Sequence, residues 1–342
     1  MPRLNRTRPP PAAGGTLRCL VAAIGLVAAS PTHAGAYSAL YAFGDSLSDA
    51  GNLFIDTGGA YYAPPYAMGR ASNGPTWVED LSLRLGLGPL TASEAGGNDY
   101  AYGFAATGPA LPGAPASVPG VNQQVARFTV ANGGVAPSTG LYIVWIGAND
   151  IIQALDDIGS GIITPGQAVT DLGIAAQAAA GAVQTLASEG ARTFIVPTIP
   201  DLAQVPDVAA IPGLGPLATG LTDAYNSALL ADVGALIRSD GIDVTFIDAG
   251  ALLDAIIADP AGFGLTDATD ACYVGPLSGG GTVCATPDQY LFWDGEHPSA
   301  AGHRLIADAV ANAIPAPPGL PLFAPGVLLL AALRRRAAGD RH

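Results

Sequence analysis

Residues 39–52 read ALYAFGDSLSDAGN, an apolar run that passes directly into a glycine and then into polar residues. A short apolar run bounded in this way predicts a buried β-strand over residues 39–43. Polar side chains that follow such a strand lie at its carboxyl end, where open α/β sheets bind their ligands. Ser46 is therefore expected on a turn facing a cleft, although a serine here could also simply cap the next helix.

The middle of the chain alternates further strand patterns with helical ones. This alternation predicts an α/β fold of three layers, α/β/α and flavodoxin-like, with a central and mostly parallel sheet. No internal repeat or linker interrupts residues 37–313, so we expect a single domain there. The expected strands are residues 141–146, 193–196 and 244–247, and the expected helices are residues 168–188, 222–237 and 299–313.

A second polar cluster, WIGAND at residues 145–150, follows the second expected strand. The side-chain amide of Asn149 could enter the same cleft as Ser46 and donate a hydrogen bond to an oxyanion. Removing one such donor from a serine protease costs about 2.7–4 kcal/mol of transition-state stabilisation. An asparagine that only shapes a turn is the alternative.

A third polar cluster, WDGEHP at residues 293–298, contains Asp294 and His297. A serine nucleophile needs a base, and the base needs an acceptor that fixes its tautomer. The chain has four histidines, of which one lies near the start and one is the last residue. The base is therefore expected to be His297, or else His303, for which a structural role inside the last helix is the alternative.

These three clusters, in this order, resemble blocks I, III and V of the GDSL/SGNH hydrolases, a family of serine esterases and lipases. The segments GRASNGP at residues 69–75 and PDL at residues 200–202 are also similar to family segments. The resemblance implies an ester hydrolase that needs no cofactor. It implies these roles: Ser46 as nucleophile and backbone oxyanion donor, Asn149 as a second oxyanion donor, His297 as general base and Asp294 as its orienting partner.

Block II of this family usually reads NYA-x-GGA, and residues 99–105 here read DYAYGFA. The family's second glycine is thus replaced by Phe104. Because the oxyanion donor from this block is a backbone N–H group, the substitution need not remove it. We expect Gly103 to supply that N–H, with Phe104 as its competitor.

The charge of the chain excludes some classes of function. All 14 basic residues are arginines, and the residues between the two ends carry only six of them against 27 acidic residues, a formal charge of −21. Such a surface repels phosphate backbones, so we expect no nucleic-acid partner. The histidines are too few for a histidine-rich metal site, and no metal is expected.

The cysteines fit an oxidising compartment. Cys272 and Cys284 flank a glycine-rich segment, and two thiols alone are too few for a metal site. We expect them to form one disulfide that fixes a loop.

Both ends of the chain carry the patterns of sorting signals. Arginines precede an apolar run at residues 19–29, and small residues then offer cleavage after Ala34 or Ala36. This pattern predicts a secretory signal peptide over residues 1–36, because eleven apolar residues are too few for the alternative of a membrane anchor.

At the other end, a proline-rich stretch, an apolar run broken by Pro325 and three arginines occupy much of residues 314–342. This order resembles the PEP-CTERM and VPLPA-type sorting tails of Gram-negative bacteria, although it lacks a plain Pro-Glu-Pro. The resemblance implies transient membrane association and removal by an exosortase-type enzyme. A simple membrane tail is the alternative.

Together these features predict an exported serine esterase in the periplasm, on the cell surface or outside the cell of a Gram-negative bacterium. Its substrate would be a lipid, a small ester or an acylated glycan. A lipase or phospholipase and a polysaccharide acetylesterase are the alternatives within this class. From another class, the chain could be a catalytically inactive surface or matrix protein.

Overall fold

A parallel sheet forms the centre of the computed structural model, which describes residues 37–314. Its strands are β1 (Leu40–Gly44), β2 (Leu141–Trp145), β3 (Thr193–Pro197) and β4 (Asp243–Ile247), hydrogen-bonded in the order β1-β2-β3-β4. Every neighbouring pair is parallel. The four strands expected from the sequence are therefore present, each with its ends within one residue of the expected position.

A fifth segment runs along the free edge of β1 without forming a regular strand. Ala42 and Asp99 form a parallel bridge, the Tyr100 N–H donates to the Ala42 carbonyl at 2.8 Å, and the Ala42 N–H donates to the Asn98 carbonyl at 3.2 Å. The second segment in the chain thus lies outside the first strand, which is the order of a flavodoxin-like sheet. In such a sheet a crevice opens at the carboxyl ends of the two strands where the chain changes direction, here β1 and β2.

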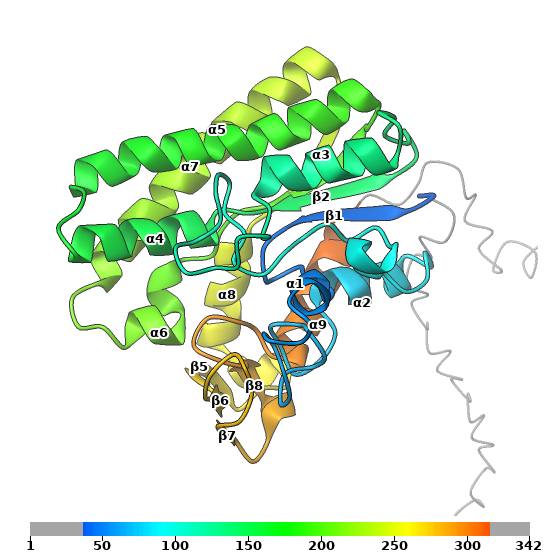
Figure 1. The fold of residues 1–342 in the computed structure, drawn as a ribbon. Helices are drawn as coiled ribbons and strands as arrows, with labels where there is room; N and C mark the ends of the chain where they lie inside the picture. The colour runs from blue at the N-terminus through cyan, green and yellow to red at the C-terminus, as the bar shows by residue number, and fades with distance from the viewer. Residues whose placement is uncertain (1–36, 315–342) are drawn as a thin grey trace, which may run out of the picture. The chain divides into compact units, whose positions relative to one another are not determined.

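Helices cover both faces of this sheet, so the expected three-layer α/β/α fold is confirmed (Figure 1). One face carries α3 (Val121–Ala131), α5 (Pro165–Glu189) and α7 (Gly215–Asp240), and the other carries α2 (Trp77–Arg84) and α9 (Ala300–Ala313). Four further helices lie at the ends of the sheet or in loops: α1 (Asn52–Asp56), α4 (Ala148–Gly159), α6 (Pro206–Ala209) and α8 (Ala249–Ala258).

The long helix α5 shows why the sequence forms a helix at this position. The Thr164 hydroxyl accepts a hydrogen bond from the Gln167 N–H, and Pro165 occupies the first turn, where a missing N–H costs nothing. Gly190 ends the helix with a φ of 122°, a conformation that favours glycine. The helix begins three residues before the expected start because the cap lies at Thr164.

Short strands near the end of the chain form two small sheets. β5 (Asp267–Ala271) pairs with β8 (Tyr290–Phe292), and β6 (Tyr273–Val274) forms an antiparallel pair with β7 (Thr282–Val283). Cys272 and Cys284 form a disulfide across the ends of the β6–β7 pair, as expected.

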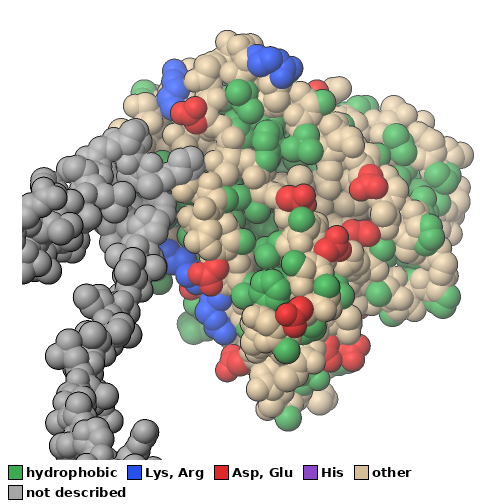
Figure 2. Space-filling model, turned by 180° about the vertical axis from the view of Figure 1, so that it is seen from behind, with side chains coloured by type: hydrophobic (Ala, Val, Ile, Leu, Met, Phe, Trp, Pro, Cys, Tyr) green, Lys and Arg blue, Asp and Glu red, His purple; other side chains and the backbone are tan. Residues whose placement is uncertain are grey.

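The described surface is predominantly acidic. Figure 2 shows acidic side chains scattered among apolar and uncharged ones, with arginines mainly toward the margins of the view. Among residues 37–314, no helix is both long enough and apolar enough to cross a membrane. The expected signal peptide and nearly all of the expected sorting tail lie outside the described residues.

Candidate active site

Ser46 lies two residues beyond the end of β1, at the carboxyl edge of the sheet, and is 7% exposed. The turn that carries it is fixed by Asp45, whose side chain accepts the Leu47 N–H at 3.0 Å and whose carbonyl accepts the Ser48 N–H at 3.1 Å. A Cβ atom on Gly44 would lie 2.2 Å from the Trp145 carbonyl oxygen. Only glycine therefore permits β1 to approach β2 directly before the serine turn.

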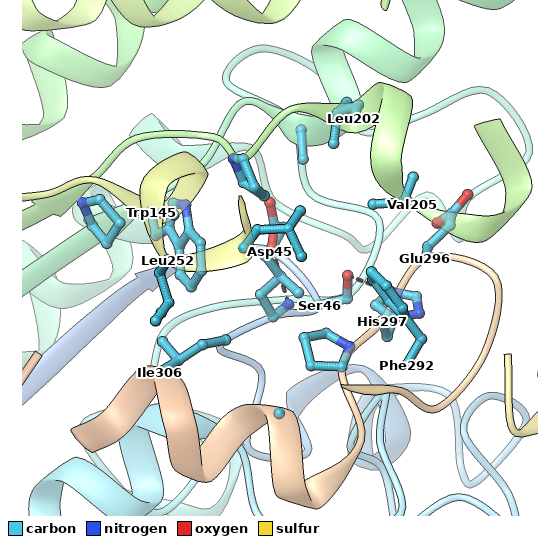
Figure 3. Close-up of a pocket in the computed structure, with 18 of the residues that line it drawn as sticks. Asp45, Ser46, Trp145, Leu202, Val205, Leu252, Phe292, Glu296, His297 and Ile306 are labelled. Atoms are coloured by element: carbon cyan, nitrogen blue, oxygen red, sulfur yellow. Dashed lines mark hydrogen bonds between the residues drawn. The ribbon is translucent and has the colours of Figure 1, made fainter. Parts of the chain in front are cut away.

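The structure brings Ser46 together with Asp294 and His297. The Nε2 atom of His297 lies 2.8 Å from the Ser46 Oγ, although the two residues are 251 positions apart. On the other side of the ring, Nδ1 lies 2.8 Å and 2.9 Å from the two carboxylate oxygens of Asp294. Figure 3 shows Ser46 and His297 facing each other at the wall of a cavity.

Three further donors hold the Asp294 carboxylate. Its Oδ1 accepts the backbone N–H groups of Glu296 at 3.0 Å and His297 at 2.8 Å, and its Oδ2 accepts the Tyr66 hydroxyl at 2.7 Å. Burial alone raises the pKa of Asp294, but the His297 charge and these hydrogen bonds lower it below its usual value. Asp294 is therefore held as an anion beside the imidazole. No local motif pointed to Tyr66, because it lies 228 positions from Asp294 in the chain.

The charges around His297 set its proton affinity. Burial lowers the pKa of the imidazole, but the Asp294 carboxylate, its hydrogen bond, and the acids Glu296 and Asp45 together raise it to about 9. Asp45 is itself buried, and burial raises its pKa to about 7; Glu296 is exposed, but partial loss of solvent around its carboxylate also raises its pKa. The imidazole therefore lies among acidic groups that favour its protonated form.

The alternative base, His303, has a structural position. It is buried in α9, and its Nδ1 accepts the Trp77 N–H at 3.2 Å. Burial lowers the pKa of His303 to about 3, so its ring is neutral. It makes no hydrogen bond to Ser46, and it joins α9 to the start of α2.

Asn149 lies in the first turn of α4, directly after β2, and lines the same cavities as Ser46. One hydrogen of its amide donates to the Ala105 carbonyl at 2.7 Å. An asparagine amide carries two hydrogens, so the second is available to a ligand. The hydrogen bond to Ala105 also ties Asn149 to the block II segment.

The structure corrects the expectation for Gly103. Its N–H donates to Asp49 Oδ2 at 2.8 Å and is therefore committed to a buried carboxylate instead of a substrate. The Phe104 N–H has no acceptor among the described residues. Phe104 adopts a φ of 64°, in the left-handed region that favours glycine, and its side chain lines a cavity with Ser46 and Asn149.

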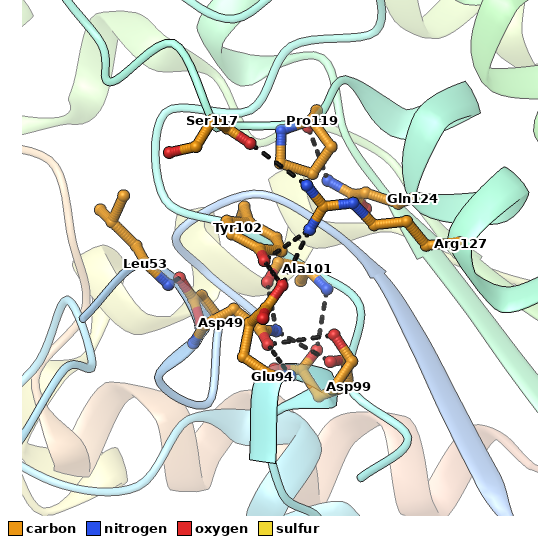
Figure 4. A network of polar contacts seen from close by, with 12 residues as sticks. Asp49, Leu53, Glu94, Asp99, Ala101, Tyr102, Ser117, Pro119, Gln124 and Arg127 are labelled. Atoms are coloured by element: carbon orange, nitrogen blue, oxygen red, sulfur yellow. Dashed lines mark hydrogen bonds and ion pairs between the residues drawn. The ribbon is translucent and has the colours of Figure 1, made fainter. Parts of the chain in front are cut away.

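Two buried carboxylates tie the block I turn to the block II segment (Figure 4). Asp49 accepts N–H groups from Gly103 and from residues 51–53, and Asp99 accepts those of Ala50 and Ala101 at 2.6 Å and 3.1 Å. Burial raises the pKa of both, that of Asp49 to about 6, and the Asp49 carboxylate raises the pKa of Asp99 further. Sequence reasoning missed this function of Asp49, although it lies inside the block I motif.

Two cavities meet at Ser46. One has a volume of about 100 Å³ and mainly apolar walls, and the other has about 410 Å³ and includes tyrosine and acidic side chains. Both are lined by Ser46, Asn149, Ile152, Glu296 and His297. The serine hydroxyl can thus be reached by a molecule with two unlike parts.

Comparisons with known proteins identify the family of the chain. Residues 40–310 match the family described as GDSL-like Lipase/Acylhydrolase. The chain is 28% identical to the phosphatidylcholine-sterol acyltransferase of Aeromonas hydrophila, over 86% of this chain and 84% of that protein. It is 28% identical to an acetylesterase of Thermothelomyces thermophilus, over 87% and 96%, and 30% identical to esterase EstA of Pseudomonas aeruginosa, over 88% of this chain and 51% of EstA. The chain belongs to the GDSL-like lipase/acylhydrolase family and is a carboxylic ester hydrolase.

Proposed function

We propose that this chain is an exported serine esterase that works through a Ser46–His297–Asp294 triad and an acyl-enzyme intermediate. The observation that carries the proposal is the continuous hydrogen-bonded row from the Ser46 Oγ through both ring nitrogens of His297 to Asp294. A serine nucleophile, a base within hydrogen-bond reach and a group that orients the base are the parts such catalysis requires. The complete row also argues against an inactive surface or matrix protein.

The reaction would proceed by acyl transfer. His297 Nε2 takes the Ser46 proton as Oγ attacks the ester carbonyl, and Asp294 stabilises the resulting imidazolium. Collapse of the tetrahedral intermediate breaks the bond to the alcohol oxygen, which receives the proton from Nε2. A water molecule then attacks the acyl-enzyme with the same base, and the acid leaves as Ser46 regains its proton.

The oxyanion of each tetrahedral intermediate needs donors that are already in place. We assign these to the Ser46 N–H, the Phe104 N–H and the Asn149 amide. Phe104 takes the place first given to Gly103, because the Gly103 N–H is held by Asp49 at 2.8 Å.

Export is part of the proposal. The Cys272–Cys284 disulfide supports it, since such bonds persist in oxidising compartments outside the cytosol. We further propose that residues 1–36 act as a signal peptide and that residues 314–342 give a transient membrane attachment that an exosortase-type enzyme removes. Mass measurement of the mature protein from its native host tests both cleavages.

The triad is tested by Ser46→Ala. We expect this variant to lose essentially all turnover of p-nitrophenyl acetate and to lose labelling by a fluorophosphonate probe, because only an activated serine reacts with that probe. Ser239→Ala, at an exposed position near the end of α7, is the matched control and should keep both. Retained turnover or labelling in Ser46→Ala would remove the nucleophile from the proposal.

A further inference from the structure

We propose that the smaller, apolar cavity beside Ser46 binds the acyl chain of the substrate, that it fits a chain of medium length, and that Leu252 and Ile306 help to limit this length. The inference rests on the proposed function, since it assigns the two sides of the ester to the two cavities. The larger cavity would then receive the alcohol. The substrate class is therefore a medium-chain carboxylic ester of a polar alcohol.

The smaller cavity is apolar except where it meets the candidate active site. Its only polar side chains are Asp45, Ser46, Asn149, Glu296 and His297, all of which belong to the segments that form the candidate active site. Every other lining residue is apolar or glycine. A cavity that is polar only at the reacting serine suits a chain that is polar only at its ester end.

The walls of this cavity come from several elements. Leu252 on α8 and Ile306 on α9 line it, together with Trp145 at the end of β2 and Phe292 at the end of β8 (Figure 3). Leu252 and Ile306 are only partly buried, whereas Trp145 and Phe292 are buried. Substitutions at Leu252 or Ile306 can therefore change the cavity with little effect on the packing of the sheet.

The volume sets the length of the chain. Apolar cavities remain dry and take up apolar ligands, and a group of about the size of a water molecule needs roughly 10–15 Å³. A volume of about 100 Å³ thus accepts on the order of six to ten methylene-sized groups. Each methylene that enters should raise kcat/KM about fourfold, the equivalent of ~0.8 kcal/mol, until the cavity is full.

Because His297 lines both cavities, the polar lining of the larger one assigns it to the alcohol. The leaving oxygen must reach Nε2, and the larger cavity is lined by Asp294 and Gly295 next to this histidine and by Tyr62, whose ring centre is 6.2 Å from the imidazole. Its remaining walls include Asp207 and Tyr66. Carboxylate and phenol groups suit an alcohol that carries further hydroxyl groups.

The test is a series of p-nitrophenyl esters from acetate to palmitate, assayed with the wild-type protein and four variants. We expect kcat/KM of the wild type to peak between hexanoate and decanoate. Leu252→Trp should fill the cavity and lower the octanoate-to-acetate ratio on the order of a hundredfold, whereas Leu252→Ala should move the peak to longer chains by about two or three carbons. Ile306→Trp narrows the cavity from α9, and Leu83→Trp, an exposed position on α2, is the matched control and should keep the wild-type profile.

The outcomes separate this inference from the proposed function. If Leu252→Trp loses all turnover, Ile306→Trp decides, and a lower octanoate-to-acetate ratio with acetate turnover retained supports the inference. Suppose that the wild type hydrolyses acetate and is labelled at Ser46. If its chain-length profile is flat, or if both Leu252 variants and Ile306→Trp keep the wild-type profile, the acyl assignment is wrong and the esterase proposal stands. Absence of both turnover and labelling in the wild type would instead overturn the proposed function.

Discussion

At the scale of single residues, the acidic groups around His297 determine at which pH this proposed base can act. Asp294 fixes the ring and favours its charged form, and Glu296 and Asp45 add to this effect. A general base must be neutral before it can accept a proton from the serine. The same carboxylate that orients the imidazole therefore moves the working range of the base to higher pH.

This electrostatic arrangement predicts an alkaline pH profile. Because the pKa of His297 is raised from 6.5 to about 9, kcat/KM should increase with pH through a midpoint near the raised value. Glu296→Gln removes one charge that raises this pKa, so its midpoint should fall. Glu94→Gln, whose carboxylate pairs with Arg127 away from Ser46, should leave the midpoint unchanged. A wild-type midpoint near 6.5 that Glu296→Gln does not move would contradict this reading.

A second residue-scale prediction concerns Asn149, the proposed oxyanion donor. Asn149→Ala should lower kcat on the order of 10²–10³-fold with a much smaller change in KM, because the lost hydrogen bond matters most in the transition state. Steady-state kinetics on p-nitrophenyl butyrate measures this. Asn132→Ala removes an amide that donates to the Phe128 carbonyl in α3, away from Ser46, and its kcat should stay near the wild-type value. Equal kcat in the two variants would exclude Asn149 as a donor.

The sequence could identify Ser46, Asp294, Asn149 and His297 because each belongs to a short local motif. It could not assign the block II donor, because the choice depends on which N–H group Asp49 takes, and that contact joins two separate loops. The same limit applies to Tyr66, whose hydroxyl reaches Asp294 only after the whole chain has folded.

At the scale of elements, the strands were predictable and several helices were not. The strands are short apolar runs bounded by polar residues, whereas α8 is an almost unbroken apolar run that a sequence pattern cannot distinguish from a buried strand. In α3 the buried face consists of Val121, Gln124, Val125 and Phe128. This is helical spacing, but the buried glutamine obscures the apolar pattern, because its amide is used to bind Gly44 across the sheet edge.

The β6–β7 pair gives an element-scale prediction. The disulfide closes a loop with a sequence separation of 12, and a loop of this size corresponds to about 3 kcal/mol in the chain-entropy description. We expect the double variant Cys272→Ser/Cys284→Ser to lose stability of this order in urea denaturation. Its KM should rise for esters of bulky alcohols, since Tyr273 and Val274 line the larger cavity.

The matched control is the reducing agent. Dithiothreitol should move the urea midpoint of the wild type toward that of the double variant and leave the double variant itself unchanged. Identical midpoints for the oxidised wild type and the double variant would show that the bond does not stabilise the fold.

At the scale of the whole molecule, catalysis and stability respond to pH in opposite directions. The pKa values of Asp49, Asp45 and His297 are raised in the folded state to about 6, about 7 and about 9. A group with a raised pKa stabilises the fold fully only below its unfolded pKa, and this stabilisation is lost as pH rises through the folded value. The kcat/KM of ester hydrolysis, in contrast, should increase as pH approaches and passes the raised pKa of His297.

We therefore expect the free energy of unfolding to fall between pH 6.5 and pH 9.5, above the range in which the lowered pKa of His303 has the opposite effect, and urea denaturation at several pH values measures this. Asp45→Asn keeps an acceptor for the Leu47 N–H but carries no titrating charge, so its stability should fall less steeply across pH 7. Asp243→Asn, at an exposed position in β4, should follow the wild type. Stability that increases from pH 6.5 to pH 9.5 would contradict the raised pKa values.

The overall architecture was predictable for a related reason. Alternating strands and helices specify a layered α/β fold, and the right-handed connections of such folds restrict the possible strand orders. The edge segment at residues 98–102 was not predictable as part of the sheet, because it contains the polar residues Asn98 and Asp99 and pairs with β1 through only a few hydrogen bonds.

The separation of 251 positions between the hydroxyl and the imidazole has a consequence for biosynthesis. A ribosome delivers Ser46 early and His297 close to the end of this domain, so a growing polypeptide holds a nucleophile with no partner for most of its translation. Chains that end before His297 would lack the proposed base and would not hydrolyse esters. Hydrolysis through the proposed triad can therefore begin only when the last part of the domain has been made.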